Sequence, residues 1–205
     1  MRTGRRKGFR RQFGLDRSGP PPRQTRPGQP LRPWTIPNAV GYLRLAALPV
    51  FLVIAFSSGD GRDPWAAAIF WLIAVGDYLD GFIARATGQY SRMGALLDPV
   101  VDRLAILSGV VVCWHFDLLP RWALAVLVVR EVVTLILAQV YLRRVGELDI
   151  NWLGRIAVGP VMASIFFAMV SDSWVWDTML IVGVVLGVLG TIAYIRTGLR
   201  ELATP

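Results

Sequence analysis

The sequence predicts an all-α membrane protein with six transmembrane helices. Three observations predict it. Hydrophobic residues make up 54% of the 205-residue chain. A soluble domain of this size rarely carries so many, because its surface must face water. The apolar residues also gather in runs of about 20, the length that crosses a bilayer core of roughly 30 Å. Short polar connections separate these runs.

The expected helices, in chain order, are 37–57, 65–86, 95–116, 121–142, 153–171 and 174–195. The second and third contain aspartates, so we predict them from their length and polar flanks rather than from hydropathy alone. Five tryptophans fall near the predicted helix ends, where their amphipathic rings suit the headgroup region. These anchors are Trp114, Trp122, Trp152, Trp174 and Trp176.

Residues 1–33 read as a basic, disordered tail, and residues 34–200 as one transmembrane domain. Ten of the 22 Lys and Arg residues lie within the first 32 positions, among many Pro and Gly. Such a segment has little to bury and is attracted to anionic lipid headgroups. We expect no nucleic-acid partner, because no basic helix or aromatic stacking platform accompanies the tail.

The distribution of positive charge predicts the orientation. If the N-terminus is cytoplasmic, 17 Lys and Arg residues lie on the inner side and only Arg62 and Arg121 on the outer side. Cytoplasmic loops carry this excess, so both termini are expected to be cytoplasmic. Arg outnumbers Lys 21 to 1. That ratio is typical of a GC-rich bacterial genome, so we expect a multi-pass protein of the bacterial plasma membrane.

Four aspartates in the second and third helices are the candidate chemistry. Asp77 and Asp80 are three residues apart, and Asp98 and Asp102 are four apart, so each pair shares a helix face. The connection 87–94 is short, which makes the two helices antiparallel neighbours. All four carboxylates then converge near the cytoplasmic side of the membrane. Ionisable groups in spans are costly and need partners.

Two kinds of partner are possible for these carboxylates. Oxygen ligands suit hard divalent ions such as Mg²⁺, Mn²⁺ or Ca²⁺, and no histidine or cysteine lies nearby to favour zinc. Two bridged metals would clamp the attacking and leaving oxygens at a phosphorus centre. The alternative is a set of buried salt bridges. Its expected arginines are Arg85, Arg103 and Arg130.

Small and basic residues surround the aspartates. Gly81 and Ala84 allow close approach of a diphosphate or a neighbouring helix, and Gly94 permits a tight helix start. Arg85 and Arg92 stand where phosphate oxygens need positive partners. The sole cysteine and sole histidine, Cys113 and His115, lie outside this stretch and are expected to be a buried apolar residue and an interfacial side chain.

The order D-x2-D-G-x2-A-R-x8-G-x3-D-x3-D, from Asp77 to Asp102, resembles the signature of CDP-alcohol phosphotransferases at every fixed position. Thr35-Ile36-Pro37-Asn38, followed by Arg44, resembles the opening of the phosphatidylglycerophosphate and cardiolipin synthase branch. The resemblance covers residues 34 to 200, more weakly toward the C-terminus.

The resemblance implies a role for each matching residue. Asp77, Asp80 and Asp98 would bind two Mg²⁺ or Mn²⁺ ions, and Asp102 would complete the site and act as general base. The acceptor alkoxide would attack the β-phosphorus of CDP-diacylglycerol, and CMP would leave. The expected CDP-binding residues are Asn38, Gly81, Ala84, Arg85 and Gly94.

The acceptor is expected to be glycerol-3-phosphate, with phosphatidylglycerol (giving cardiolipin) second and inositol phosphate third. Arg130, Arg155 and Arg196 are its candidate ligands. Arg155 falls where relatives carry Lys in Gly-Lys-Ile. Each arginine also has an alternative reading: Arg155 and Arg196 as topology charges, and Arg130 as the buried partner of Glu131.

A cation- or proton-coupled transporter is the alternative from a different class. It would need charges near the midplane with access to both faces, whereas these aspartates cluster toward one face. We therefore predict a CDP-diacylglycerol-dependent phosphatidyltransferase that works as a homodimer in the lipid bilayer.

Overall fold

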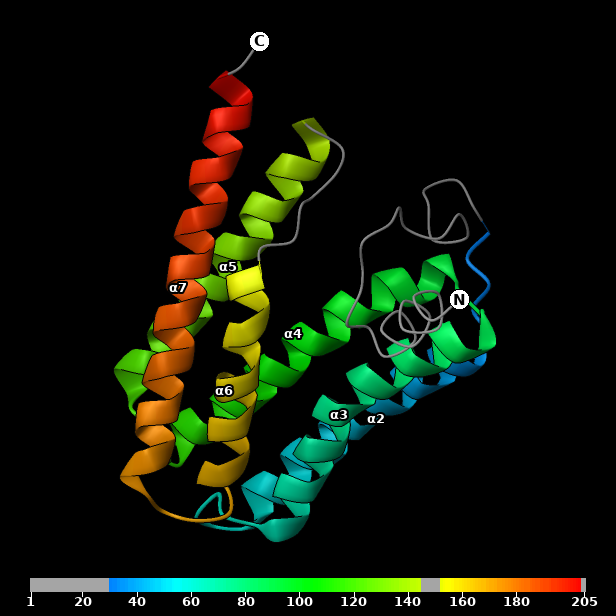
Figure 1. The fold of residues 1–205 in the computed structure, drawn as a ribbon. Coiled ribbons are helices and arrows are strands. Elements are labelled where there is room, and N and C mark those ends of the chain that lie inside the picture. Colours follow the sequence, from blue (N-terminus) through cyan, green and yellow to red (C-terminus); the bar gives the residue numbers. More distant parts are fainter. Residues whose placement is uncertain (1–29, 145–151, 204–205) are drawn as a thin grey trace, which may run out of the picture. The chain divides into compact units, whose positions relative to one another are not determined.

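The computed structural model describes residues 30–144 and 152–203. In these residues the secondary structure is entirely helical, which confirms the all-α prediction (Figure 1). The helices are α2 (Ile36–Ser57), α3 (Pro64–Thr87), α4 (Arg92–His115), α5 (Arg121–Arg144), α6 (Trp152–Ala168) and α7 (Trp174–Ala203). Most of the basic tail, and all of the connection between α5 and α6, lies outside the described residues.

Capping side chains determine where α3 and α4 begin. The Asp63 carboxylate accepts the backbone N–H groups of Trp65 and Ala66 at 2.8 and 2.9 Å. Ser91 Oγ accepts the backbone N–H of Gly94 at 2.9 Å. Both satisfy donors that the first helical turn leaves free. Because Ser91 is a cap, α4 starts at Arg92, three residues before the predicted start.

The far ends of α3, α6 and α7 differ from the prediction, and α6 stops at Ala168, three residues before its predicted end. α3 stops at Thr87, where Gly88 adopts a left-handed backbone conformation with φ of 68°. That conformation is the common helix terminator and favours glycine. α7 continues to Ala203, eight residues past the predicted end. Its last turns contain Arg196 and Arg200 among polar residues, so apolar content alone could not predict them.

The described chain divides into two compact units. The first comprises residues up to Val53 together with Ala68–Ala105, which gives it most of α2 and α3 and the first half of α4. α2 and α3 run antiparallel and side by side (Figure 1). The buried rings of Phe51 and Phe70 meet between them at 5.4 Å. This unit contains all four candidate aspartates.

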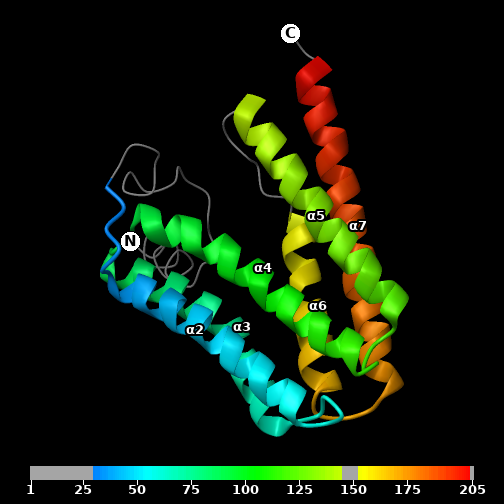
Figure 2. The same ribbon diagram turned by 180° about the vertical axis from the view of Figure 1, so that it is seen from behind.

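The second unit comprises Ile54–Ala67 and everything from Ile106 onward. In it α6 packs along α7, and α5 also contacts α7 (Figure 2). An added Cβ at Gly183 would lie 2.7 Å from Val161 Cγ2 and 3.0 Å from its backbone nitrogen. Glycine therefore lets α6 and α7 approach more closely than any larger residue would.

In the described residues, three helices are long and apolar enough to cross a membrane: Ile36–Ser57, Pro64–Thr87 and Trp174–Ala193. α4 and α5 carry charged residues in their middle, and α6 is shorter. Large apolar side chains such as Leu43, Leu72 and Val129 are more than 60% exposed. A surface of this kind suits hydrocarbon rather than water. The chain is thus a membrane protein, and the count of six spans stays a prediction.

Candidate active site

Arg44, on α2, lies at the centre of the candidate site. Its side chain is only 4% exposed. Its Nε donates a hydrogen bond of 2.8 Å to the backbone carbonyl of Ile73 on α3. An added Cβ at Gly76 would lie 2.6 Å from Arg44 Cδ, so the glycine leaves the space in which the arginine stem lies. The guanidinium is therefore anchored by backbone and packing at one end.

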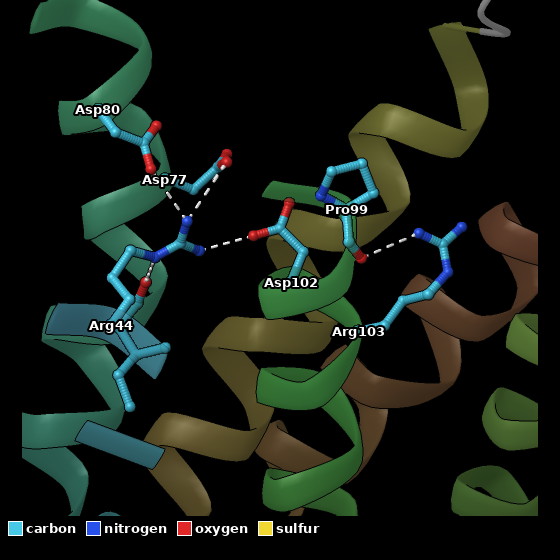
Figure 3. A network of polar contacts seen from close by, with 7 residues as sticks. Arg44, Asp77, Asp80, Pro99, Asp102 and Arg103 are labelled. Carbon is cyan, nitrogen blue, oxygen red and sulfur yellow. Dashed lines mark hydrogen bonds and ion pairs between the residues drawn. The ribbon is translucent and has the colours of Figure 1, made fainter. Parts of the chain in front are cut away.

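The other end of the guanidinium faces three of the predicted aspartates (Figure 3). Nη1 donates to Asp80 Oδ2 at 3.1 Å and lies 3.7 Å from Asp77 Oδ1. Nη2 donates to Asp102 Oδ1 at 2.6 Å. Asp77 and Asp80 come from α3 and Asp102 from α4, so three of the four carboxylates predicted to converge gather about Arg44. One cation joins three helices.

Exposure differs sharply among these carboxylates. The Asp80 side chain is 5% exposed, whereas those of Asp77 and Asp102 are 51% and 42% exposed. Asp98 lies one turn before Asp102 on α4 and is half-buried. The cluster thus has a closed side at Asp80 and an open side at Asp77 and Asp102, from which a cation or a substrate can reach it.

The arginine partners that the sequence suggested are different from the one observed. Arg103 donates to the backbone carbonyl of Pro99 at 3.2 Å (Figure 3). Arg130 pairs with Glu131, as its alternative reading predicted. Arg85 lies over Gly81, with Nη1 3.1 Å from the position of an added Cβ. The alternative that paired the aspartates with arginines is therefore wrong for Arg103 and Arg130, which have other partners, and the observed ion pairs are made by Arg44.

Asn38 and Gly94 contact each other next to the N-terminus of α4. The Asn38 side chain is 2% exposed, and its Nδ2 donates to the backbone carbonyls of Arg32 and Pro33 at 3.0 and 2.9 Å. Its Oδ1 accepts the Ser91 hydroxyl at 2.8 Å, and an added Cβ at Gly94 would approach it to 2.7 Å. The side chain of Asn38 thus ties the segment before α2 to the start of α4.

The remaining predicted site residues lie in both units. Gly81, Ala84 and Arg85 are half-buried in the last turns of α3. Arg130 and Arg196 belong to the second unit, where Arg196 is exposed. Arg155 lies in the first turn of α6, and its side chain is outside the described part of the structure. Their roles toward CDP and the acceptor stay predictions.

The donor set fits a hard divalent cation in its chemistry. It offers carboxylate oxygens alone, which are the ligands that Mg²⁺ and Mn²⁺ favour. The Arg44 guanidinium, within 3.7 Å of three of these carboxylates, marks where the structure holds positive charge. Among the described residues, no three Asp, Glu, His or Cys side chains surround one common metal position in this arrangement.

Sequence reasoning missed the contacts of Arg44 and the need for Gly76. Both stand within apolar helices, at positions where a charged residue and a glycine are unfavourable. An arginine in an apolar run needs an acceptor in another helix, and a glycine facing it provides the room. That pairing of signals could have linked α2 to the aspartates.

These features define a class of protein: a helical membrane protein with an acidic site on adjacent helices. Residues 34–189 match the family described as CDP-alcohol phosphatidyltransferase. The chain belongs to this family, and the resemblance inferred from the aspartate signature is confirmed.

Curated relatives fall into two named activities. The chain is 39% identical to a cardiolipin synthase (CMP-forming) of Streptomyces coelicolor over 147 residues, covering 69% of this chain and 68% of the relative. It is 34% identical to a putative cardiolipin synthase of Mycobacterium tuberculosis, of which it spans 58%. It is 30% identical to a CDP-diacylglycerol–glycerol-3-phosphate 3-phosphatidyltransferase of Bacillus subtilis, of which it spans 57%. The expected enzyme class, a transferase of phospholipid synthesis, agrees with these names.

Proposed function

We propose that the protein transfers a phosphatidyl group from CDP-diacylglycerol to a hydroxyl of phosphatidylglycerol, releasing CMP and forming cardiolipin. The observation that carries this proposal is the gathering of Asp77, Asp80 and Asp102 about one cationic group. These are residues of the family signature. Their convergence supports a single site for phosphoryl chemistry.

In this proposal Asp77, Asp80, Asp98 and Asp102 hold two Mg²⁺ or Mn²⁺ ions. When bound, the ions supply neutralisation of the diphosphate and of the departing CMP. Asp102 also takes the proton from the acceptor hydroxyl. The proton goes to a carboxylate oxygen that binds no ion. The partial exposure of Asp102 supports this role, because the acceptor must reach it.

The CDP moiety would lie against the last turns of α3. Gly81 and Ala84 offer little side-chain bulk there, and the Arg85 guanidinium is close to Gly81. A guanidinium binds phosphate oxygens through charge-assisted hydrogen bonds. Gly94 and Asn38 would support this region by holding the α4 N-terminus in place.

The acceptor order is changed from the one the sequence suggested. The relatives with greater identity and coverage are named cardiolipin synthases, so phosphatidylglycerol now comes first. Arg130 should also attract the phosphate of glycerol-3-phosphate less strongly than an unpaired arginine would, because its charge is paired with Glu131. Glycerol-3-phosphate is the second candidate, favoured by the Bacillus subtilis relative. Arg155 and Arg196 remain the candidate ligands for an acceptor phosphate.

The acceptor test is a purified-enzyme assay with labelled CDP-diacylglycerol and Mn²⁺. Phosphatidylglycerol, glycerol-3-phosphate and inositol phosphate are supplied separately, and product lipids and CMP are both measured. We expect CMP release with phosphatidylglycerol, and cardiolipin as the product. Phosphatidylglycerophosphate from glycerol-3-phosphate alone would select the second candidate. Release of CMP with none of the acceptors would contradict the transfer reaction.

We further propose six transmembrane helices, a cytoplasmic site and both termini in the cytoplasm of a bacterium, with the domain 34–200 following the tail 1–33 and acting as a homodimer. The charge asymmetry of the loops supports the orientation. Single cysteines test it, because Cys113 is fully buried and replaceable by Ala. A membrane-impermeant thiol reagent on intact cells should label Asp60→Cys and not Gln89→Cys. Labelling of the second variant would reverse the orientation.

A further inference from the structure

Arg44 holds together the acidic cluster as the structure presents it. It is buried, and each nitrogen of its guanidinium faces an oxygen: Nε the Ile73 carbonyl, Nη1 the Asp80 carboxylate, and Nη2 the Asp102 carboxylate. The planar fork reaches two carboxylates from different helices at once, which a lysine ammonium cannot do in the same way. The positive charge therefore occupies the middle of the predicted metal-binding residues.

Close positive charge has a definite effect on these ligands. A cation within about 4–6 Å favours the ionised carboxylate over the protonated form by a factor of about ten to a thousand. The same cation repels a second cation that approaches the same oxygens. A divalent ion entering the cluster must displace Nη1 and Nη2 from Asp80 and Asp102, or share these carboxylates with them.

We propose that Arg44 is a counterion of the acidic cluster that competes with divalent ions for the carboxylates of Asp80 and Asp102. The inference rests on the proposed metal-dependent function. Arg44 lies against three carboxylates and joins α2 to α3 and α4. An ion that binds Asp80 and Asp102 takes over the balance of their charge, so Arg44 lowers the affinity for metal.

A competing role makes the opposite prediction. If Arg44 only arranged the carboxylates for the metal, its removal would weaken metal binding. If Arg44 competes with the metal, its removal strengthens binding, and the metal-free protein alone loses stability. The direction of the change in metal affinity therefore decides the question.

The experiment measures Mn²⁺ binding in detergent by electron paramagnetic resonance, without lipid substrate. Wild type, Arg44→Met and Arg44→Lys are purified with Mn²⁺ present, so that a variant unstable without metal is still folded at the start. A chelator then draws the ion away. We expect Arg44→Met to bind Mn²⁺ about tenfold more tightly than wild type. Arg44→Lys should lie between the two, because it keeps the charge without the fork.

Arg103→Met is the matched control. It removes an arginine next to Asp102 in sequence, but one whose guanidinium donates to the Pro99 carbonyl instead of to the aspartates. Its Mn²⁺ affinity should change by much less than that of Arg44→Met. An equal rise in Mn²⁺ affinity in both variants would show that the effect comes from net charge alone. That result would overturn the specific role of Arg44.

Thermal unfolding provides the second measurement. The difference between unfolding temperatures with Mn²⁺ and with EDTA should be larger for Arg44→Met than for wild type. Unchanged or weaker Mn²⁺ binding by Arg44→Met overturns the counterion role while leaving the metal site intact. Failure of the wild type itself to bind Mn²⁺ overturns the proposed metal site, so the two failures are distinguishable.

Discussion

Two arginines in apolar helices, the buried Arg44 in the first unit and the half-buried Arg130 in the second, are neutralised in different ways. Each lies against a helical glycine: Gly76 for Arg44 and Gly187 for Arg130. Arg44 reaches three carboxylates on two other helices. Arg130 pairs with Glu131, its neighbour in sequence. Among the described residues, Arg130 Nε is buried without a hydrogen-bond partner.

The difference is between an arginine that bridges several helices and one that is neutralised within its own helix. A cation that bridges carboxylates on other helices couples the positions of those helices, so its loss affects all of them. A cation neutralised by the next residue couples nothing beyond its own helix turn. The first arrangement leaves several acidic groups to be balanced, which is what a cation-binding site needs. The second leaves a neutral pair.

The largest expected effect is the loss of turnover when metal is removed, which should depend on the Arg44 cluster and not on the Arg130–Glu131 pair. Excess EDTA should abolish turnover, and added Mn²⁺ or Mg²⁺ should restore it, because four carboxylates cannot remain ionised together without cations. Asp80→Asn should remove the rise in unfolding temperature that Mn²⁺ produces, whereas Glu131→Gln should keep it. Full turnover in EDTA, with no retained metal by elemental analysis, would end the metal-dependent mechanism.

The next effect lies within the Arg44 cluster. Asp102→Asn keeps the shape of the side chain but cannot accept a proton, so kcat should fall by about 10²-fold or more while CDP-diacylglycerol still binds. Asp77→Asn should instead weaken metal and nucleotide binding together. Steady-state kinetics at several Mn²⁺ concentrations distinguish the two. Recovery of full kcat by Asp102→Asn at high Mn²⁺ would make Asp102 a ligand only.

Stability should respond differently to the loss of each arginine. Arg44→Met and Arg130→Met each leave a buried carboxylate unpaired, which typically costs about 3–5 kcal/mol. Replacing the whole pair in Arg130→Met/Glu131→Leu should recover most of that loss, because buried ion pairs are often replaceable by apolar residues. Arg44→Met/Asp80→Leu should not recover, since Asp77 and Asp102 remain. Thermal unfolding in EDTA measures all four variants, and equal recovery would erase the distinction.

The glycines give the smallest effects. An added Cβ at Gly76 lies 2.6 Å from Arg44 Cδ, so Gly76→Ala should cost about 1–3 kcal/mol through overpacking. At Gly187 the nearest atom is Arg130 Nε at 3.2 Å. There the helix propensity gained by alanine, about 1 kcal/mol, offsets the tighter contact. Unfolding temperatures of the two variants test this order, and a larger loss at Gly187 would contradict it.

Periodicity and hydropathy located the helices well, because length and apolar content determine them locally. The helix boundaries missed were those controlled by single side chains, such as the Ser91 cap of α4. The aspartates were found because their spacing along two helices is itself the signal. Asp77 and Asp80 needed only the geometry of one helix to share a face.

The partner of the aspartates could not be found in that way. Arg44 is 36 residues from Asp80 and 58 from Asp102, so no spacing rule relates them. The contact depends on how α2 packs against α3, which Gly76 permits. The sequence therefore predicted acidic groups that need a cation, but its salt-bridge alternative named Arg103 and Arg130, which have other partners.

The order of Arg44, Asp80 and Asp102 along the chain bears on how the protein enters its membrane. Synthesis runs from the N-terminus, so α2 with its arginine is made before α3 and α4 with their acids. A lone charge in an apolar helix is costly to insert. Inserting Arg44 with α2 has this free-energy cost. The aspartates of the helices made later then have the Arg44 guanidinium as an ion-pair partner. We therefore expect α3 to insert into the membrane more readily when α2 has preceded it.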